Sequence, residues 1–146
     1  MPYAQTFVRF AGWGLEALLL PPLLAAAALA GFSVAWAGYK QKPMRTGLWK
    51  RYHWLAAMHL VFFFAALAVG VIWQNPQTNP TLPHPASRVG TTWLGIVTYA
   101  SYASCVFWVW RMRGFRWFAS SLMLLLELPV FGALLIAGMS VGGEWL

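Results

Sequence analysis

One carboxyl group stands near the middle of a long apolar segment of this chain. Residues 116–139 carry no charge after Arg116 except Glu127, which lies close to their centre. A charged side chain at the centre of a bilayer costs roughly 2.5–3.5 kcal/mol even on lenient insertion scales. Glu127 is therefore expected to be neutral, paired inside the protein, or used as a proton-exchanging group. The structural alternative is a protonated carboxyl group that donates one hydrogen bond to a neighbouring helix.

Two other apolar segments offer partners at about the same depth. His59 lies about one helical turn closer than Glu127 to the side of the bundle that carries the basic loops. The two side chains can therefore pair across a bundle. Ser101 and Tyr102 share one helical face with Thr98 and Cys105, at spacings i, i+3, i+4 and i+7. We expect the proton-relay or ligand residues among Glu127, His59, Tyr102 and Ser101. The alternatives are hydroxyl groups that join helices, a packed histidine, and a Cys105 that acts as a small buried hydrophobic residue.

The histidines and the single cysteine argue against metal, haem and catalytic centres. His53 and His59 are six residues apart, about 240° around a helix, and His84 falls in a different loop. This spacing predicts no metal site and no bis-histidine haem within one chain. A haem or quinone held at a subunit interface remains open, although no cofactor is predicted. Without a catalytic triad or a phosphate loop, we predict no catalytic residues and no self-contained enzyme.

Composition and hydropathy indicate that the chain that carries these polar candidates is a membrane protein. Of 146 residues, 60% are hydrophobic and 9% are charged, whereas soluble domains carry about 25% charged residues. Apolar segments long enough to cross a bilayer cover residues 16–39, 54–73, 93–110 and 116–139. Residues 1–12 resemble an interfacial segment, and Pro21-Pro22 falls inside the first span. The sequence thus predicts one all-α membrane domain over residues 1–146, an integral bundle of four transmembrane helices.

Charged loops predict how the bundle is oriented. Eight of the ten basic residues lie in the first and third connections, residues 40–52 and 111–116, whereas the N-terminus and the loop 74–92 hold one each. The positive-inside rule puts the two basic loops in the cytoplasm and both termini outside, most simply across a bacterial inner membrane. The basic residues are expected to contact lipid headgroups or an acidic partner. They are Lys40, Lys42, Arg45, Lys50, Arg51, Arg111, Arg113 and Arg116.

Three functions are compatible with this sequence. The first is a non-catalytic, accessory subunit of a larger membrane complex, such as a respiratory or photosynthetic one. The reason is that we predict no soluble domain and the chain has few ionisable groups. The alternative is a small oligomeric proton-coupled transporter that uses Glu127. The third is a haem- or quinone-related membrane protein. The expected partners are the lipid bilayer and other membrane subunits or further copies of the chain, and not nucleic acid.

Overall fold

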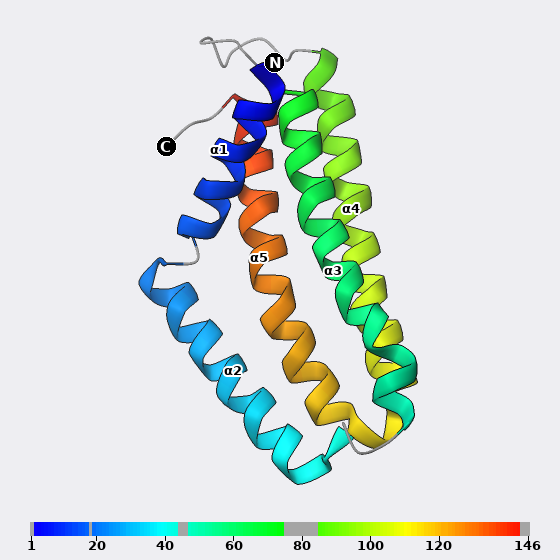
Figure 1. Cartoon of the computed structure of the whole chain (residues 1–146). Coiled ribbons are helices and arrows are strands. Elements are labelled where there is room, and N and C mark those ends of the chain that lie inside the picture. The colour runs from blue at the N-terminus through cyan, green and yellow to red at the C-terminus, as the bar shows by residue number, and fades with distance from the viewer. Residues whose placement is uncertain (1, 18, 44–46, 75–84, 144–146) are drawn as a thin grey trace.

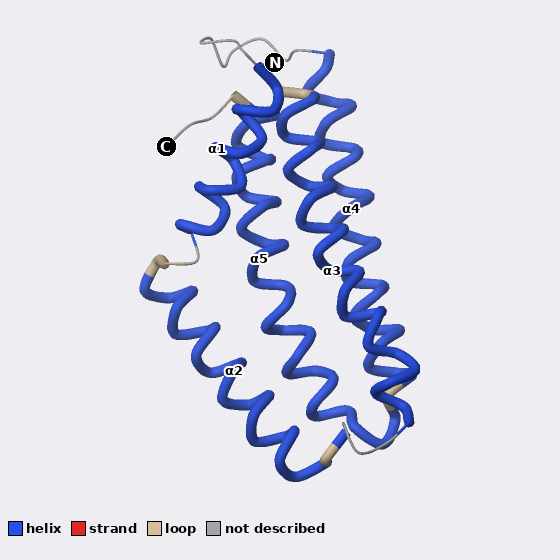
Figure 2. The backbone as a smooth tube through the Cα atoms, viewed as in Figure 1, coloured by secondary structure: helices blue, strands red, loops and turns tan. Residues whose placement is uncertain are grey.

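The chain folds into helices that run roughly along one axis. The structure, a computed structural model, describes all residues except 1, 18, 44–46, 75–84 and 144–146 (Figure 1). The described residues form helices joined by short turns, with no strand among them (Figure 2). In chain order the elements are α1 (Pro2–Ala17), α2 (Pro21–Gln41), α3 (Gly47–Ile72), α4 (Pro85–Arg111), the short 3₁₀ helix η2 (Arg113–Phe115) and α5 (Arg116–Gly142).

Four helices are long and apolar enough to cross a membrane, which confirms the predicted all-α bundle. The four segments are Pro21–Gln41, His53–Ile72, Arg88–Arg111 and Arg113–Gly142. The second and fourth agree with the expected spans to within a few residues at each end. The third begins earlier than expected, because α4 already starts at Pro85. Proline is well tolerated at the first position of a helix, where its missing N–H has no helical acceptor to lose.

The first expected span, 16–39, is wrong at its start. The helix is interrupted between α1 and α2. Glu16 belongs to the last turn of α1 rather than to the spanning helix. Two prolines explain the break, because they cannot donate the backbone hydrogen bonds that would continue α1. Leu20, directly before them, has φ −59° and ψ 134°, the extended geometry that a following proline favours. α2 therefore starts anew at Pro21.

The N-terminal residues form a packed helix rather than the interfacial segment expected for residues 1–12. α1 packs against α3 and α5, and Phe10 is only 2% exposed. Phe7 stacks on Phe64 of α3, with 6.2 Å between ring centroids. Figure 1 shows α1 beside the upper part of α5 and α2 beside its lower part. The shorter α1 and the longer α2 thus flank different parts of the same central helix.

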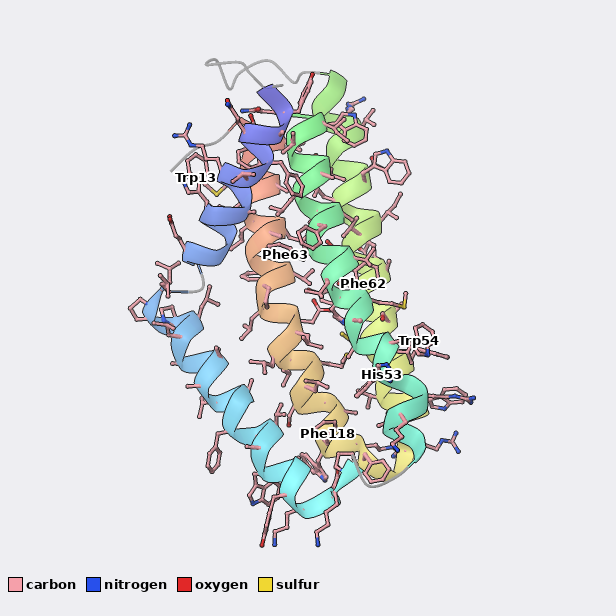
Figure 3. The ribbon with its side chains drawn as sticks, viewed as in Figure 1. Trp13, His53, Trp54, Phe62, Phe63 and Phe118 are labelled. Atoms are coloured by element: carbon pink, nitrogen blue, oxygen red, sulfur yellow. The ribbon has the colours of Figure 1, made fainter. Side chains whose placement is uncertain are left out.

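α5 is the central helix, because α1, α2, α3 and α4 all pack against it. Two groups of buried apolar side chains lie along it. The upper cluster joins α1, α3, α4 and α5, and the lower cluster joins α2, α3, α4 and α5; Figure 3 labels Phe63 of the first and Phe118 of the second. The upper cluster consists of Phe10, Phe63, Ala66, Leu67, Val71, Val97, Val130 and Ala133, and the lower cluster of Ala37, Leu55, Trp108, Met112, Phe118, Ala119 and Met123.

Hydrogen bonds fix the ends of α5 to its neighbours. The backbone N–H of Phe118 donates to the Gln41 side chain at 3.1 Å, so the end of α2 satisfies a free amide in the first turn of α5. Near the other end, the Ser140 hydroxyl donates to the Gly70 carbonyl of α3 at 2.8 Å. These contacts hold α5 at a defined depth relative to α2 and α3.

Replacing Gly70 with alanine tests the closest helix contact. A Cβ at Gly70 would lie 2.8 Å from Ala137 Cα, backbone that cannot easily give way, whereas a Cβ at Gly31 of α2 would meet nothing within 4 Å. We expect Gly70→Ala to destabilise the protein by about 1–3 kcal/mol through overpacking, and Gly31→Ala to leave stability unchanged or slightly higher. Thermal unfolding in mild detergent measures both. Equal stability of the two variants would contradict the close packing of α3 on α5.

Candidate functional site

Three polar side chains from three helices meet between the upper and lower clusters. His59 of α3 places Nε2 3.3 Å from Glu127 Oε1 of α5 and 3.3 Å from Cys105 Sγ of α4. The Cys105 thiol donates to the same Glu127 oxygen at 3.0 Å. The three atoms thus form a compact triangle, which we call the polar cluster. The predicted pairing of His59 with Glu127 is present, and Cys105 completes it.

A hydroxyl group of α4 supports the second oxygen of the carboxyl group. Ser101 Oγ lies 3.5 Å from Glu127 Oε2 and 3.1 Å from the Thr98 carbonyl of its own helix. Its single proton can serve only one acceptor at a time, and the longer contact with Glu127 is the weaker of the two. Ser101 is buried, as expected for a residue that joins two helices.

Helical periodicity explains why these residues face one another. On α3, Leu55 and Phe63 lie one turn either side of His59, and both are buried. On α5, Met123 and Val130 are buried on either side of Glu127. Residues three or four positions apart occupy one face of a helix. The apolar side chains that pack the helices together therefore carry the polar ones into the same interface.

Beside the polar cluster is a pocket between α4 and α5. Its volume is about 740 Å³, and both Cys105 and Glu127 form part of its wall. The Glu127 side chain is 18% exposed, whereas that of His59 is 1% exposed, so a molecule in the pocket can reach Glu127 and Cys105 but not His59. The pocket is lined by Tyr102, Cys105, Val106, Val109, Trp110, Arg116, Ser120, Met123, Leu124 and Glu127.

The pocket approaches the polar cluster from one end of the bundle. Arg116, Ser120 and Glu127 lie on one face of α5 at positions i, i+4 and i+11, and all three line the pocket. Arg116 begins α5, about 16 Å along the helix from Glu127. On the other side of Glu127 the buried Val130 and Ala133 belong to the upper cluster. The pocket thus borders the polar cluster on the Arg116 side of Glu127, whereas packed apolar side chains lie on the opposite side.

The donor atoms of the polar cluster include three that metals use. His59 Nε2, Cys105 Sγ and a Glu127 oxygen all lie within 4.8 Å of one another. His59 Nδ1, on the opposite side of the ring, is buried and has no hydrogen-bond partner among the described residues. Nothing on that side fixes the ring in one tautomer. The imidazole can therefore present either an N–H or a lone pair to Glu127 and Cys105.

One expectation about this region needs correction. Cys105 is not an inert hydrophobic residue, since it contacts both His59 and Glu127. The absence of a metal site stays a prediction, which rested on the spacing of the histidines; the structure brings one histidine, one cysteine and one glutamate together. The sequence did contain a signal, because Cys105 shares a helical face with Ser101, which we expected to face Glu127.

The remaining candidates occupy other positions. Tyr102 lines the pocket and is 54% exposed, so it borders the site without entering the polar cluster. His53 is exposed, and its Nδ1 lies 2.9 Å from the Lys50 carbonyl. His59 is 2% exposed and directs Nε2 inward, away from any neighbouring subunit. This orientation gives no support to a haem shared between subunits through His59.

The basic residues gather at the end of the bundle where α5 begins, and one of them, Arg116, lines the pocket. Lys40, Lys42, Lys50, Arg111, Arg113 and Arg116 are exposed there. The Arg113 guanidinium lies 5.3 Å from the Trp110 ring centroid, a cation–π contact typical of an aqueous interface. Arg45 lies outside the described residues, and the Arg51 side chain is not described.

Removing the acceptor from the polar cluster should lower stability. Glu127→Leu leaves His59 and Cys105 without their shared acceptor in an apolar environment, at a cost of about 1–3 kcal/mol. Glu127→Gln keeps a carbonyl oxygen and should lose clearly less. Thermal unfolding in mild detergent compares both with the wild type. If Glu127→Leu were as stable as the wild type, the cluster would contribute nothing to the packing of α3, α4 and α5.

Comparisons with known proteins give no match for this chain. No protein-family model, no curated protein and no solved structure matches it.

Proposed function

We propose that this protein is a small proton-coupled membrane transporter whose coupling site is the pair Glu127 and His59. One observation carries the proposal. A carboxyl group and an imidazole, 3.3 Å apart, lie about midway along α5, with a pocket on one side and packed apolar residues on the other. Intramembrane ionisable residues that face the interior of a bundle commonly mark ion or proton pathways.

The arrangement supplies what proton exchange needs. A single proton shared between Glu127 and His59 leaves the pair neutral overall in either position, so the pair is tolerated in a low-dielectric interior. Cys105 and Ser101 add hydrogen bonds that keep the carboxyl group in place when its proton leaves. The proton or substrate enters along the Arg116–Ser120 face of the pocket. Release on the other side requires the upper cluster to separate, which is the conformational step of an alternating-access cycle.

Infrared spectroscopy tests proton exchange at Glu127 directly, because the chain has only three acidic side chains, Glu16, Glu127 and Glu144. In the double variant Glu16→Gln, Glu144→Gln, purified in dodecyl maltoside, which carries no carbonyl group, Glu127 is the only side-chain carboxyl group in the sample. We expect a carboxylic-acid C=O band that disappears between about pH 4 and pH 10, a range that brackets ordinary and strongly perturbed carboxyl groups. Adding Glu127→Gln should abolish the band. A Glu127 signal that does not change over this range would contradict the proposal.

The second candidate is the accessory subunit of a larger membrane complex, and the outer face of α2 favours it. Only 11% of the α2 span is buried, against 44% for α3. Its exposed side chains include Leu29, Phe32, Trp36 and Tyr39, a surface that lipid, a second copy or another subunit can cover. A Glu127 band that does not respond to pH, together with stoichiometric larger subunits after gentle extraction, would favour this candidate over the transporter.

We propose further that the protein lies in a bacterial inner membrane with both termini outside. The support is the clustering of basic residues at the end of the bundle where α2 and α4 finish. In a Cys105→Ser background, a membrane-impermeant maleimide applied to spheroplasts should label Tyr3→Cys at once. It should label Lys40→Cys only after the membrane is permeabilised. Both positions are exposed in the folded chain. The reverse labelling pattern would invert the orientation.

A further inference from the structure

The three donor atoms of the polar cluster are set at the spacing that one metal ion requires. We propose that His59 Nε2, Cys105 Sγ and a Glu127 carboxylate oxygen bind one divalent transition-metal ion of the zinc class. The distances between these atoms are 3.3, 3.3 and 3.0 Å. Bonds of about 2.0–2.3 Å at tetrahedral angles hold ligand atoms about 3.3–3.6 Å apart. The three atoms therefore need to move apart by at most about half an ångström.

The donor types select the ion. Thiolate sulfur and imidazole nitrogen favour borderline transition metals such as Zn²⁺ and Co²⁺, whereas Mg²⁺ and Ca²⁺ prefer sites made only of oxygen. The unpartnered Nδ1 of His59 supports this reading, because the ring proton can reside there and leave the Nε2 lone pair free for the ion. Ser101 can steady the Glu127 oxygen that does not bind the metal.

Charge balance favours a divalent ion at this depth. A thiolate, a carboxylate and a neutral imidazole carry a total charge of −2, so one M²⁺ makes the site neutral, as a low-dielectric interior demands. Without metal, the same three groups are neutral when they hold two protons, one on Cys105 and one shared by His59 and Glu127. Binding one M²⁺ then releases two protons, and the charge of the site does not change.

The fourth coordination position faces the pocket. Cys105 and Glu127 both line that pocket, whereas His59 closes the opposite side of the cluster. Three protein ligands with an open position are typical of sites that exchange a ligand or release the ion, in contrast to closed structural sites. In the proposed transporter, divalent ions of this class are the substrate, and each is exchanged for two protons. This role rests on the proposed function, whereas the binding itself does not.

Cobalt titration of the purified full-length protein in mild detergent tests the site. Because Cys105 is the only cysteine of the chain, any thiolate-to-cobalt charge-transfer band must arise from it. We expect this band, together with the visible bands of tetrahedral Co²⁺, to saturate at one equivalent and to disappear when Zn²⁺ is added. We also expect a pH indicator to record the release of about two protons per ion. Absence of the charge-transfer band at millimolar Co²⁺ would overturn the proposal.

Matched variants separate the ligands from their surroundings. Loss of a residue that hydrogen-bonds to a metal ligand lowers the metal affinity about 10–100-fold. Removal of a ligand itself should therefore lower the affinity at least about 100-fold. Cys105→Ser should also abolish the charge-transfer band, and Glu127→Gln should weaken binding while retaining the band at high Co²⁺. His53→Ala, which removes an exposed histidine of the same helix, should bind as the wild type does. A full band in Cys105→Ser, or loss of binding in His53→Ala, would place the metal elsewhere.

The same preparations distinguish failure of this inference from failure of the proposed function. A pH-dependent Glu127 band in a protein that gives no cobalt band would leave the transporter proposal standing and overturn the metal site. A cobalt band at Cys105 without uptake of Zn²⁺ into protein-containing vesicles, and without a pH response of Glu127, would support the metal site and overturn the transporter. Zn²⁺ uptake that Glu127→Gln abolishes and His53→Ala preserves would support both.

Discussion

The structure depends on one constraint, which is that a carboxyl group among apolar side chains must find polar partners within the protein. Glu127 meets it through His59, Cys105 and Ser101, each contributed by a helix other than α5. An unpaired polar group would cost far more there than at a surface. The contacts fix the relative depth and rotation of α3, α4 and α5. The same partners give the site its chemistry, so the stability of the bundle and its reactivity are properties of the same atoms.

The apolar packing around this cluster is asymmetric. The upper cluster, with Leu67 and Val130 at its centre, closes the bundle on one side of Glu127. On the other side, the pocket separates part of α4 from α5 and leads toward Arg116. A purely structural hydrogen bond between helices would need no such access. This asymmetry, more than the presence of Glu127, favours a site that exchanges something with its surroundings over one that only joins helices.

Proton coupling and metal binding are compatible at this cluster because both leave it neutral. Two protons or one divalent cation compensate the same two negative groups, Cys105 thiolate and Glu127 carboxylate, while His59 adjusts its tautomer. A single cysteine in a chain of 146 residues cannot form an intrachain disulfide. Its contacts with a histidine and a glutamate therefore favour a role in hydrogen bonding or metal coordination over a covalent structural role.

The sequence by itself determined the helical architecture, the four segments apolar enough to cross a membrane, and the similar heights of Glu127 and His59 along their helices, because hydropathy and the rise of a helix are local properties. It did not determine the break before Pro21 or the packing of α1, although the two prolines explain that break once it is seen. Only the tertiary structure decided that Cys105 joins Glu127 and His59 while Tyr102 borders the pocket. Both residues lie on one predicted face of α4. The rotation of that helix against α3 and α5 selects between them, and that rotation is set by side-chain packing across three segments far apart in the chain.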